Sequence, residues 1–220
     1  MEVEHRLGIL GEFSKEKREQ FYKERICSST NDHQATQVPR VQAVEFWQSM
    51  EQCTKILDVA CHDGFNSRFL ADEDSVELID GIDLCSAAIE QARLLGKTKK
   101  HSEKFNYWEC SWEDFEKVSG RPKASYDLVI CFEFLEHLPF EEDIKLLQFI
   151  DSYLVPGGRV LISTPEINGK WGLRNDLERE HISLMDAAML CALVHQSIGV
   201  MPEIEHDSRS DLLMATWVKK

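Results

Sequence analysis

Three side chains that can bind a metal ion or move a proton lie close together in the sequence: Glu133, Glu136 and His137. Their i, i+3 and i+4 spacing would place all three on one face if a helical turn begins there. Two carboxylates and an imidazole suit a divalent ion such as Mg²⁺ or Mn²⁺, and His181 is a candidate fourth ligand. If no metal binds, His137 or His181 could act as a general base. A simpler alternative is that Glu136 and His137 only pack or contact a ligand.

A second group of candidates follows the first, second and third apolar segments. After the first segment comes a loop of small and acidic residues, Asp58-Val59-Ala60-Cys61-His62-Asp63-Gly64. Small residues there would let the backbone approach a ligand closely, and Cys61 is expected to be a wall of that pocket. Asp83, followed by Leu84, could accept hydrogen bonds from both hydroxyls of a ribose, or it could be a helix N-cap. Ser111 and Trp112 could hold an adenine.

Strand and helix patterns alternate from residue 55 onward, and this order must position the candidates. Apolar strands are predicted at 55–60, 75–82, 105–109, 126–132 and 159–163, with a turn at 156–158. Helices are predicted at 65–71, 86–95, 141–153 and 184–197, before a terminal strand pair at 200–205 and 212–218. This alternation predicts a parallel sheet covered on both faces, with ligands beyond the carboxyl ends of its strands.

In this order and spacing, the segment from about residue 55 to 165 resembles the class I S-adenosylmethionine-dependent methyltransferases. The stretches Phe132–Pro139 and Leu154–Gly158 are also similar to that family. The resemblance implies an α/β, Rossmann-like, doubly wound sheet of seven strands, mainly parallel with an antiparallel terminal strand. It further implies S-adenosyl-L-methionine as cofactor, bound by Asp58, Ala60, Cys61, His62, Gly64, Asp83, Leu84, Ser111, Trp112 and Cys131.

The loop after the first strand departs from the family pattern. That pattern usually reads D-x-G-x-G-x-G, whereas Ala60 and His62 stand at the first two glycine positions here and only Gly64 is kept. His62 would bring a bulky ring near the methionine part of the cofactor. It leaves open a different function, that of a catalytically silent methyltransferase-fold protein that only binds.

The motif E-x-x-E-H with a later histidine is similar to two methyltransferase groups, the ubiquinone-biosynthesis O-methyltransferases and the small-RNA 2′-O-methyltransferases. The resemblance implies a metal, held by Glu133, Glu136, His137 and His181, that chelates two adjacent hydroxyls and lowers the pKa of one. Glu136, His137 and His181 are then the catalytic candidates. The predicted reaction is O-methylation of a small molecule, and a related enzyme acting on nitrogen or carbon is the alternative.

Charge and composition restrict the partners. The net charge of −14 over 220 residues disfavours a long nucleic acid, although an RNA end is not excluded, and favours a small-molecule substrate. No apolar run approaches the roughly 18–20 residues of a membrane span. The charged first twenty residues predict no secretory signal, and seven cysteines without a CxxC pair predict reduced thiols in the cytoplasm.

The domain organisation is predicted as one main unit with an addition. Residues 1–50 are expected to form a helical extension that caps the pocket, and residues 51–220 the cofactor-binding methyltransferase domain. Nothing in the sequence indicates an oligomeric state or identifies the methyl acceptor.

Overall fold

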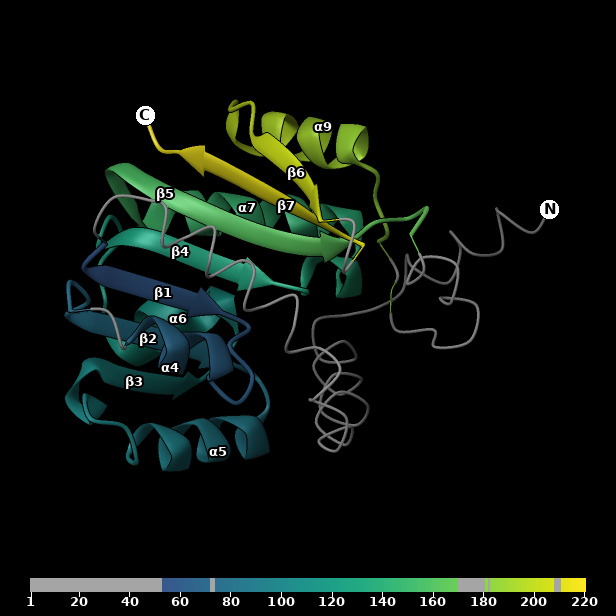
Figure 1. Ribbon diagram of the computed structural model, residues 1–220. Coiled ribbons are helices and arrows are strands. Elements are labelled where there is room, and N and C mark those ends of the chain that lie inside the picture. Colours follow the sequence, from purple (N-terminus) through teal and green to yellow (C-terminus); the bar gives the residue numbers. More distant parts are fainter. Residues whose placement is uncertain (1–52, 72–73, 170–180, 182, 208–210) are drawn as a thin grey trace.

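The computed structural model describes residues 53–71, 74–169, 181, 183–207 and 211–220. Its strands form one seven-stranded sheet in the order β3-β2-β1-β4-β5-β7-β6 (Figure 1). The strands are β1 (Lys55–Val59), β2 (Leu78–Asp83), β3 (Phe105–Glu109), β4 (Tyr126–Phe132), β5 (Leu154–Pro165), β6 (Glu203–Asp207) and β7 (Leu212–Val218). β7 pairs antiparallel with β5 and β6, and the other pairs are parallel. The predicted mainly parallel sheet with antiparallel terminal pairing is therefore confirmed.

Helices cover both faces of this sheet (Figure 1). They are α4 (Phe65–Leu70), α5 (Ser86–Gly96), α6 (Phe115–Ser119), α7 (Phe140–Tyr153) and α9 (Ala187–Ile198). Apolar side chains of α6, α7 and α9 pack against one face, and those of α4 and α5 pack against the other. Short 3₁₀ turns lie at Ser102–Lys104, Trp112–Asp114 and Leu135–His137. None of the helices in the described ranges is long and apolar enough to cross a membrane.

Alternation along the strands explains this two-sided core. In β1, Leu57 and Val59 belong to the cluster with α7 and α9, whereas Ile56 belongs to the cluster with α4, because successive side chains point to opposite faces. The strand order reverses between β1 and β4, which lie side by side in parallel. The carboxyl ends of those two strands therefore form the switch point at which such sheets bind ligands.

The structure corrects two predicted boundaries. The turn predicted at residues 156–158 lies inside β5, as a bulge where Gly157 has a φ of 81° and the register with β4 shifts. Helix α9 begins at Ala187 rather than at residue 184, because the side chain of Asp186 caps it by accepting a hydrogen bond from the backbone N–H of Met189. The predicted N-terminal extension, residues 1–50, lies outside the described residues.

Among the cysteines in the described ranges, one differs from the prediction. Five of them are free thiols, namely Cys53, Cys61, Cys110, Cys131 and Cys191. Cys85, at the beginning of α5, is disulfide-bonded, so the prediction of a fully reduced set is wrong there. The cysteines consequently give a weaker argument for a reducing compartment than the sequence suggested.

Candidate active site

The loop between β1 and α4 turns in left-handed backbone conformations. Ala60 has a φ of 57°, His62 a φ of 49° and Gly64 a φ of 73°. A non-glycine residue pays about 1 kcal/mol for this conformation, which glycine adopts freely. The two positions at which the family pattern has glycine thus keep a backbone that favours glycine, although they carry Ala60 and His62.

Asp83, at the end of β2, fixes this loop. One carboxylate oxygen accepts a hydrogen bond from the backbone N–H of His62 (2.9 Å) and the other accepts one from Cys85 (2.8 Å). The backbone N–H of Cys61 also donates to the carbonyl of Ile82 (3.0 Å). A carboxylate can accept about four hydrogen bonds, and Asp83 also accepts one from the backbone of Leu84, so it keeps acceptor capacity for a further hydroxyl. The N-cap residue of α5 is Cys85, and Asp83 is therefore not the helix cap.

Burial raises the pKa of Asp83, because a charged carboxylate loses solvation there. The backbone amides of Cys85 and His62 and the nearby His62 imidazole act in the opposite direction and favour the charged form. Additional hydrogen-bond donors would therefore stabilise the charged form of this carboxylate further. The carboxylate acceptor therefore fits the hydroxyl donors of the ribose of a nucleoside cofactor.

Gly64 is required by a neighbouring ring. A Cβ added at Gly64 would lie 2.5 Å from the hydroxyl oxygen of Tyr107 and 2.7 Å from its Cζ atom. A Cβ at Gly81 would lie 2.7 Å from the same ring, which is stacked on Phe105. Sequence reasoning expected small residues in the loop to admit a ligand. For Gly64 the structure shows a different reason, because the glycine makes room for Tyr107 of β3.

We expect Gly64→Ala to destabilise the protein by on the order of 3 kcal/mol, from steric overlap with a rigid ring and the cost of a positive φ. Urea denaturation of the wild type and the variant measures this loss. Gly120→Ala is the matched control, since Gly120 has a φ of 68° but nothing within 4 Å of an added Cβ. Equal losses in the two variants would show that Tyr107 does not restrict the loop.

Of the other predicted cofactor residues, three are buried in or directly after β1 and β4, and three follow β2 and β3. Asp58 is buried and accepts a hydrogen bond from the hydroxyl of Ser67 (2.6 Å), which ties β1 to α4. Cys61 and Cys131 are buried, and burial raises the pKa of each thiol well above its ordinary value, which is consistent with wall residues. The remaining three, Leu84, Ser111 and Trp112, follow β2 and β3.

Ser111 and Trp112 begin the 3₁₀ turn after β3. The Ser111 hydroxyl accepts a hydrogen bond from the backbone N–H of Asp114 (3.2 Å) and donates one to its carboxylate (3.0 Å). The half-buried Trp112 ring packs against Phe149 of α7, with ring centroids 5.5 Å apart. Since β3 and β2 are parallel neighbours, this turn lies on the same edge of the sheet as Asp83.

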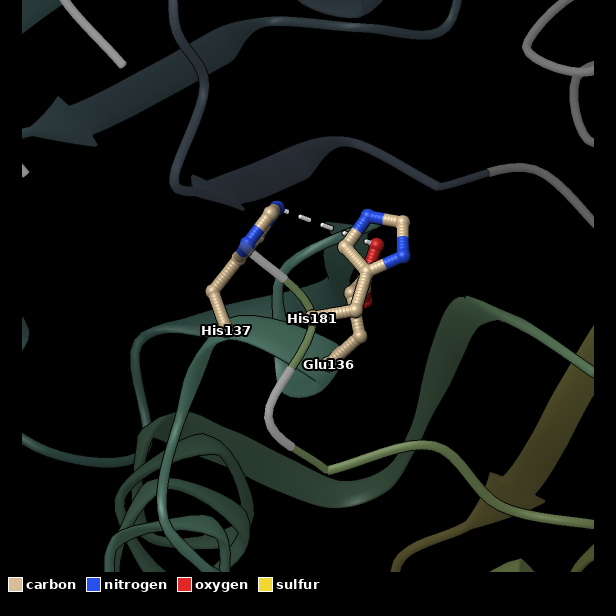
Figure 2. A group of neighbouring side chains, drawn as sticks. All are labelled: Glu136, His137 and His181. Carbon is tan, nitrogen blue, oxygen red and sulfur yellow. Dashed lines mark ion pairs between the residues drawn. The ribbon is translucent and has the colours of Figure 1, made fainter. Parts of the chain in front are cut away.

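Glu136, His137 and His181 converge at the neighbouring part of this edge (Figure 2). One ligand atom from each lies within 4.8 Å of the others. The imidazole rings have centroids 5.1 Å apart, and Nε2 of His137 lies 4.0 Å from Oε1 of Glu136. Ligand atoms opposite each other across an ion are about 4.2 Å apart, at about 2.1 Å from the metal. Small side-chain rotations would therefore bring all three to one ion.

Glu133 does not lie on the helical face that its spacing suggested. The 3₁₀ turn begins only at Leu135, and Glu133 before it has a φ of 51°. It is not part of the group of three potential ligands formed by Glu136, His137 and His181. Its charge nevertheless lies near enough to raise the pKa of Glu136.

Glu136 is a buried acid. Burial raises the pKa of its carboxyl well above the ordinary value, and the negative charge of Glu133 raises it further. Thr164, near the end of β5, donates a hydrogen bond to its Oε2 (3.2 Å). The charges of Glu136 and Asp58 both raise the pKa of the Cys131 thiol on β4, in addition to its burial. A cation here would offset two neighbouring negative charges, and the donor set therefore fits a divalent ion.

Sequence reasoning missed Asp143 and Ser183, which adjoin this group. Asp143 on α7 is fully buried and accepts a hydrogen bond from the hydroxyl of Ser183 (3.1 Å). The backbone N–H of Ser183 donates to the carbonyl of Glu136 (3.0 Å). An aspartate in the first turn of a helix is so common that only the structure separates this one from a surface residue.

Asp143 should make stability depend on pH. Burial raises its pKa from 3.8 to about 8, so the folded state holds a proton that the unfolded chain releases at lower pH. The free energy of unfolding should therefore fall as pH rises from about 4 to about 8. We expect Asp143→Asn to reduce this slope and to be more stable than the wild type at pH 8.5, in urea denaturation. In the Asp143→Asn variant, the raised pKa of Glu136 should leave a residual slope of the same sign. If the slope were the same as in the wild type, the pH dependence could not be assigned to Asp143.

Comparison with known proteins agrees with this geometry. A family model described as a methyltransferase domain matches residues 19–197. The ubiquinone biosynthesis O-methyltransferase of Hydrogenovibrio crunogenus is 34% identical over 131 residues, 60% of this chain and 50% of its own. That of Vibrio parahaemolyticus is 30% identical over 165 residues, 75% of this chain and 60% of its own. The chain spans about half the length of the curated relatives it matches.

Solved structures show the same fold. The N-methyltransferase NodS from Bradyrhizobium japonicum, in complex with S-adenosyl-L-homocysteine, has a TM-score of 0.64 at 16% identity, covering 86% of this chain and 89% of its own. At that identity the likeness concerns the fold alone. With the family match over most of the chain, it follows that this protein belongs to the methyltransferase-domain family, with the class I S-adenosylmethionine-dependent fold.

Proposed function

We propose that this protein transfers a methyl group from S-adenosylmethionine to a hydroxyl oxygen of a small molecule that carries two adjacent hydroxyls. The observation that carries the proposal is the group formed by Glu136, His137 and His181 at the edge where β1 and β4 end. The names of the curated relatives, ubiquinone biosynthesis O-methyltransferases, support an oxygen acceptor.

The cofactor would bind across the carboxyl ends of β1, β2 and β3, and it supplies an electrophilic methyl group on a positively charged sulfur. Asp83 would accept a hydrogen bond from the ribose, because its carboxylate keeps acceptor capacity beside the backbone donors that it already binds. Ser111 and Trp112, on the turn after β3, would border the adenine. The loop containing His62 would border the methionine part.

A divalent ion held by Glu136, His137 and His181 would bind the two hydroxyls of the acceptor and lower the pKa of one. The three residues would thereby set the position of the acceptor oxygen. Without a bound ion, an imidazole of His137 or His181 would instead be free to accept the hydroxyl proton. We favour a small diol over an RNA, because a chain with a net charge of −14 repels a long polyanion.

A methyl-transfer assay with a labelled cofactor tests the proposal. The acceptors are a catechol, a sugar diol, a simple amine and a short RNA, each with and without a chelator. We expect transfer to a diol that falls when the chelator is added and returns with Mg²⁺ or Mn²⁺. Transfer to the amine at a rate that the chelator does not change would exclude both the metal and the oxygen acceptor. Cofactor binding without transfer to any acceptor would favour a catalytically silent protein.

A further inference from the structure

We propose that Asp143 and Ser183 are positioning residues, which hold His181 beside Glu136 and His137. The importance of this for catalysis rests on the proposed function, whereas the positioning itself is a property of the fold. His181 precedes α9, and the other two residues follow β4, so the sequence separates them by more than 40 positions. Something must therefore bind the segment of His181 to the turn that carries Glu136.

Ser183 makes that connection with two different groups. Its backbone N–H donates a hydrogen bond to the carbonyl of Glu136 (3.0 Å), and its hydroxyl donates one to Oδ2 of Asp143 (3.1 Å). The first contact reaches the 3₁₀ turn and the second reaches α7. Ser183 lies two residues from His181, and consecutive Cα atoms are about 3.8 Å apart, so these bonds act close to the imidazole.

The chain after Ser183 is held separately. Met185 is buried, and its carbonyl accepts a hydrogen bond from the backbone N–H of Ile167 (2.9 Å). Asp186 then caps α9. Because these contacts fix the entry to α9 without Asp143, loss of Asp143 should release the part of the chain near His181 and leave α9 in place.

The burial of Asp143 supports a specific role. Its side chain is fully buried, and its Oδ1 atom has no hydrogen-bond partner among the described residues. A buried polar group without a partner destabilises the folded state. An apolar residue would avoid this cost at a position that faces the core. The aspartate is explained if its other oxygen, which holds Ser183, has a function that an apolar side chain cannot perform.

The experiment compares four variants of the full chain. Asp143→Ala and Ser183→Ala each remove the hydrogen bond between the two side chains. Asp143→Asn keeps an acceptor oxygen for the Ser183 hydroxyl and should restore the contact. Ser152→Ala is the matched control, since it removes a serine hydroxyl that bonds to the carbonyl of Phe149 (2.8 Å) at the other end of α7.

Two readouts separate positioning from the metal hypothesis. The first is NMR of labelled histidine, in which a nuclear Overhauser effect between the imidazoles of His137 and His181 reports their 5.1 Å centroid separation. The second is the affinity for Mn²⁺ alone, for which loss of a residue that orients a ligand typically costs 10–100-fold. Affinity for S-adenosylhomocysteine, measured by calorimetry, serves as a check that the rest of the site is intact.

We expect both alanine variants to lose the contact between the imidazoles and to bind Mn²⁺ roughly 10–100-fold more weakly. Asp143→Asn and Ser152→Ala should resemble the wild type in both readouts. If the wild type binds no Mn²⁺, the metal role fails, and the NMR contact still decides the positioning. If Asp143→Ala does not fold, Ser183→Ala decides. An unchanged contact between the imidazoles in the folded alanine variant, or an Asp143→Asn variant as defective as it, would overturn the proposal.

Discussion

Asparagine in place of Asp83 is expected to weaken binding of S-adenosylhomocysteine about 10–100-fold, because hydrogen bonds to a charged group contribute about 1.5–3 kcal/mol. The Asp83 side chain would have two roles, because it holds the first loop by hydrogen bonds and would also bind the ribose. Its two oxygens accept from the backbone N–H groups of His62 and Cys85, and a ribose hydroxyl would use the acceptor capacity that remains. Asparagine has the same shape, but it offers one acceptor oxygen and turns an NH₂ group toward a backbone donor.

Isothermal titration calorimetry measures this loss, with thermal unfolding as the check on the fold. Glu109→Gln is the matched control, because Glu109 pairs in register with Asp83 on the neighbouring strand but is exposed to solvent. Its affinity should stay within about 2-fold of the wild type, as expected for a surface change. If Asp83→Asn bound the ligand as tightly as the wild type while remaining folded, the cofactor pocket would have to lie elsewhere.

The second large effect is expected at Glu136. Burial and Glu133 raise the pKa of its carboxyl well above the ordinary value, which favours the neutral form when no cation is near. Glutamine imitates that neutral form and can still accept the hydrogen bond from Thr164. We therefore expect Glu136→Gln to fold with wild-type stability, yet to lose Mn²⁺ binding and to slow methyl transfer by about 10²–10⁴-fold.

Mn²⁺ titration and initial rates of methyl transfer check this prediction. His195→Gln controls for the loss of a titratable residue, since His195 lies exposed on α9, outside the group of three. Its metal affinity and rate should match those of the wild type. Methyl transfer by Glu136→Gln at the wild-type rate would remove Glu136 from the mechanism, whatever metal the protein binds.

Much of the fold follows from short-range patterns. The strands at 105–109 and 126–132 were predicted with the bounds that β3 and β4 have, because apolar runs between polar turns indicate buried strands. Asp83 was placed at the end of a strand for the same reason. The proximity of Glu136 and His181 could also be predicted, since segments that follow parallel strands gather at one edge of the sheet.

The features that could not be predicted from the sequence depend on contacts between residues that lie far apart in the chain. Tyr107 belongs to an ordinary strand pattern, and only packing shows that it fills the space over Gly64 and Gly81. Asp143 and Ser183 lie 40 positions apart and form no motif. Glu133 has the spacing of a helical neighbour of Glu136, but its left-handed backbone places it before the turn. Periodicity describes one element at a time and carries no information about such pairs.

At one edge of the described sheet, β6 presents the sequence Glu-Ile-Glu-His-Asp, with a mostly exposed surface. Unpaired strand edges attract other chains, and charged side chains on an edge oppose that pairing through repulsion. The repulsion depends on ionised carboxylates. Because the isoelectric point of the sequence is about 5.0, the protein as a whole loses its net charge near that pH. Concentrated samples should therefore stay dispersed at pH 7.5 and precipitate as the buffer approaches pH 5.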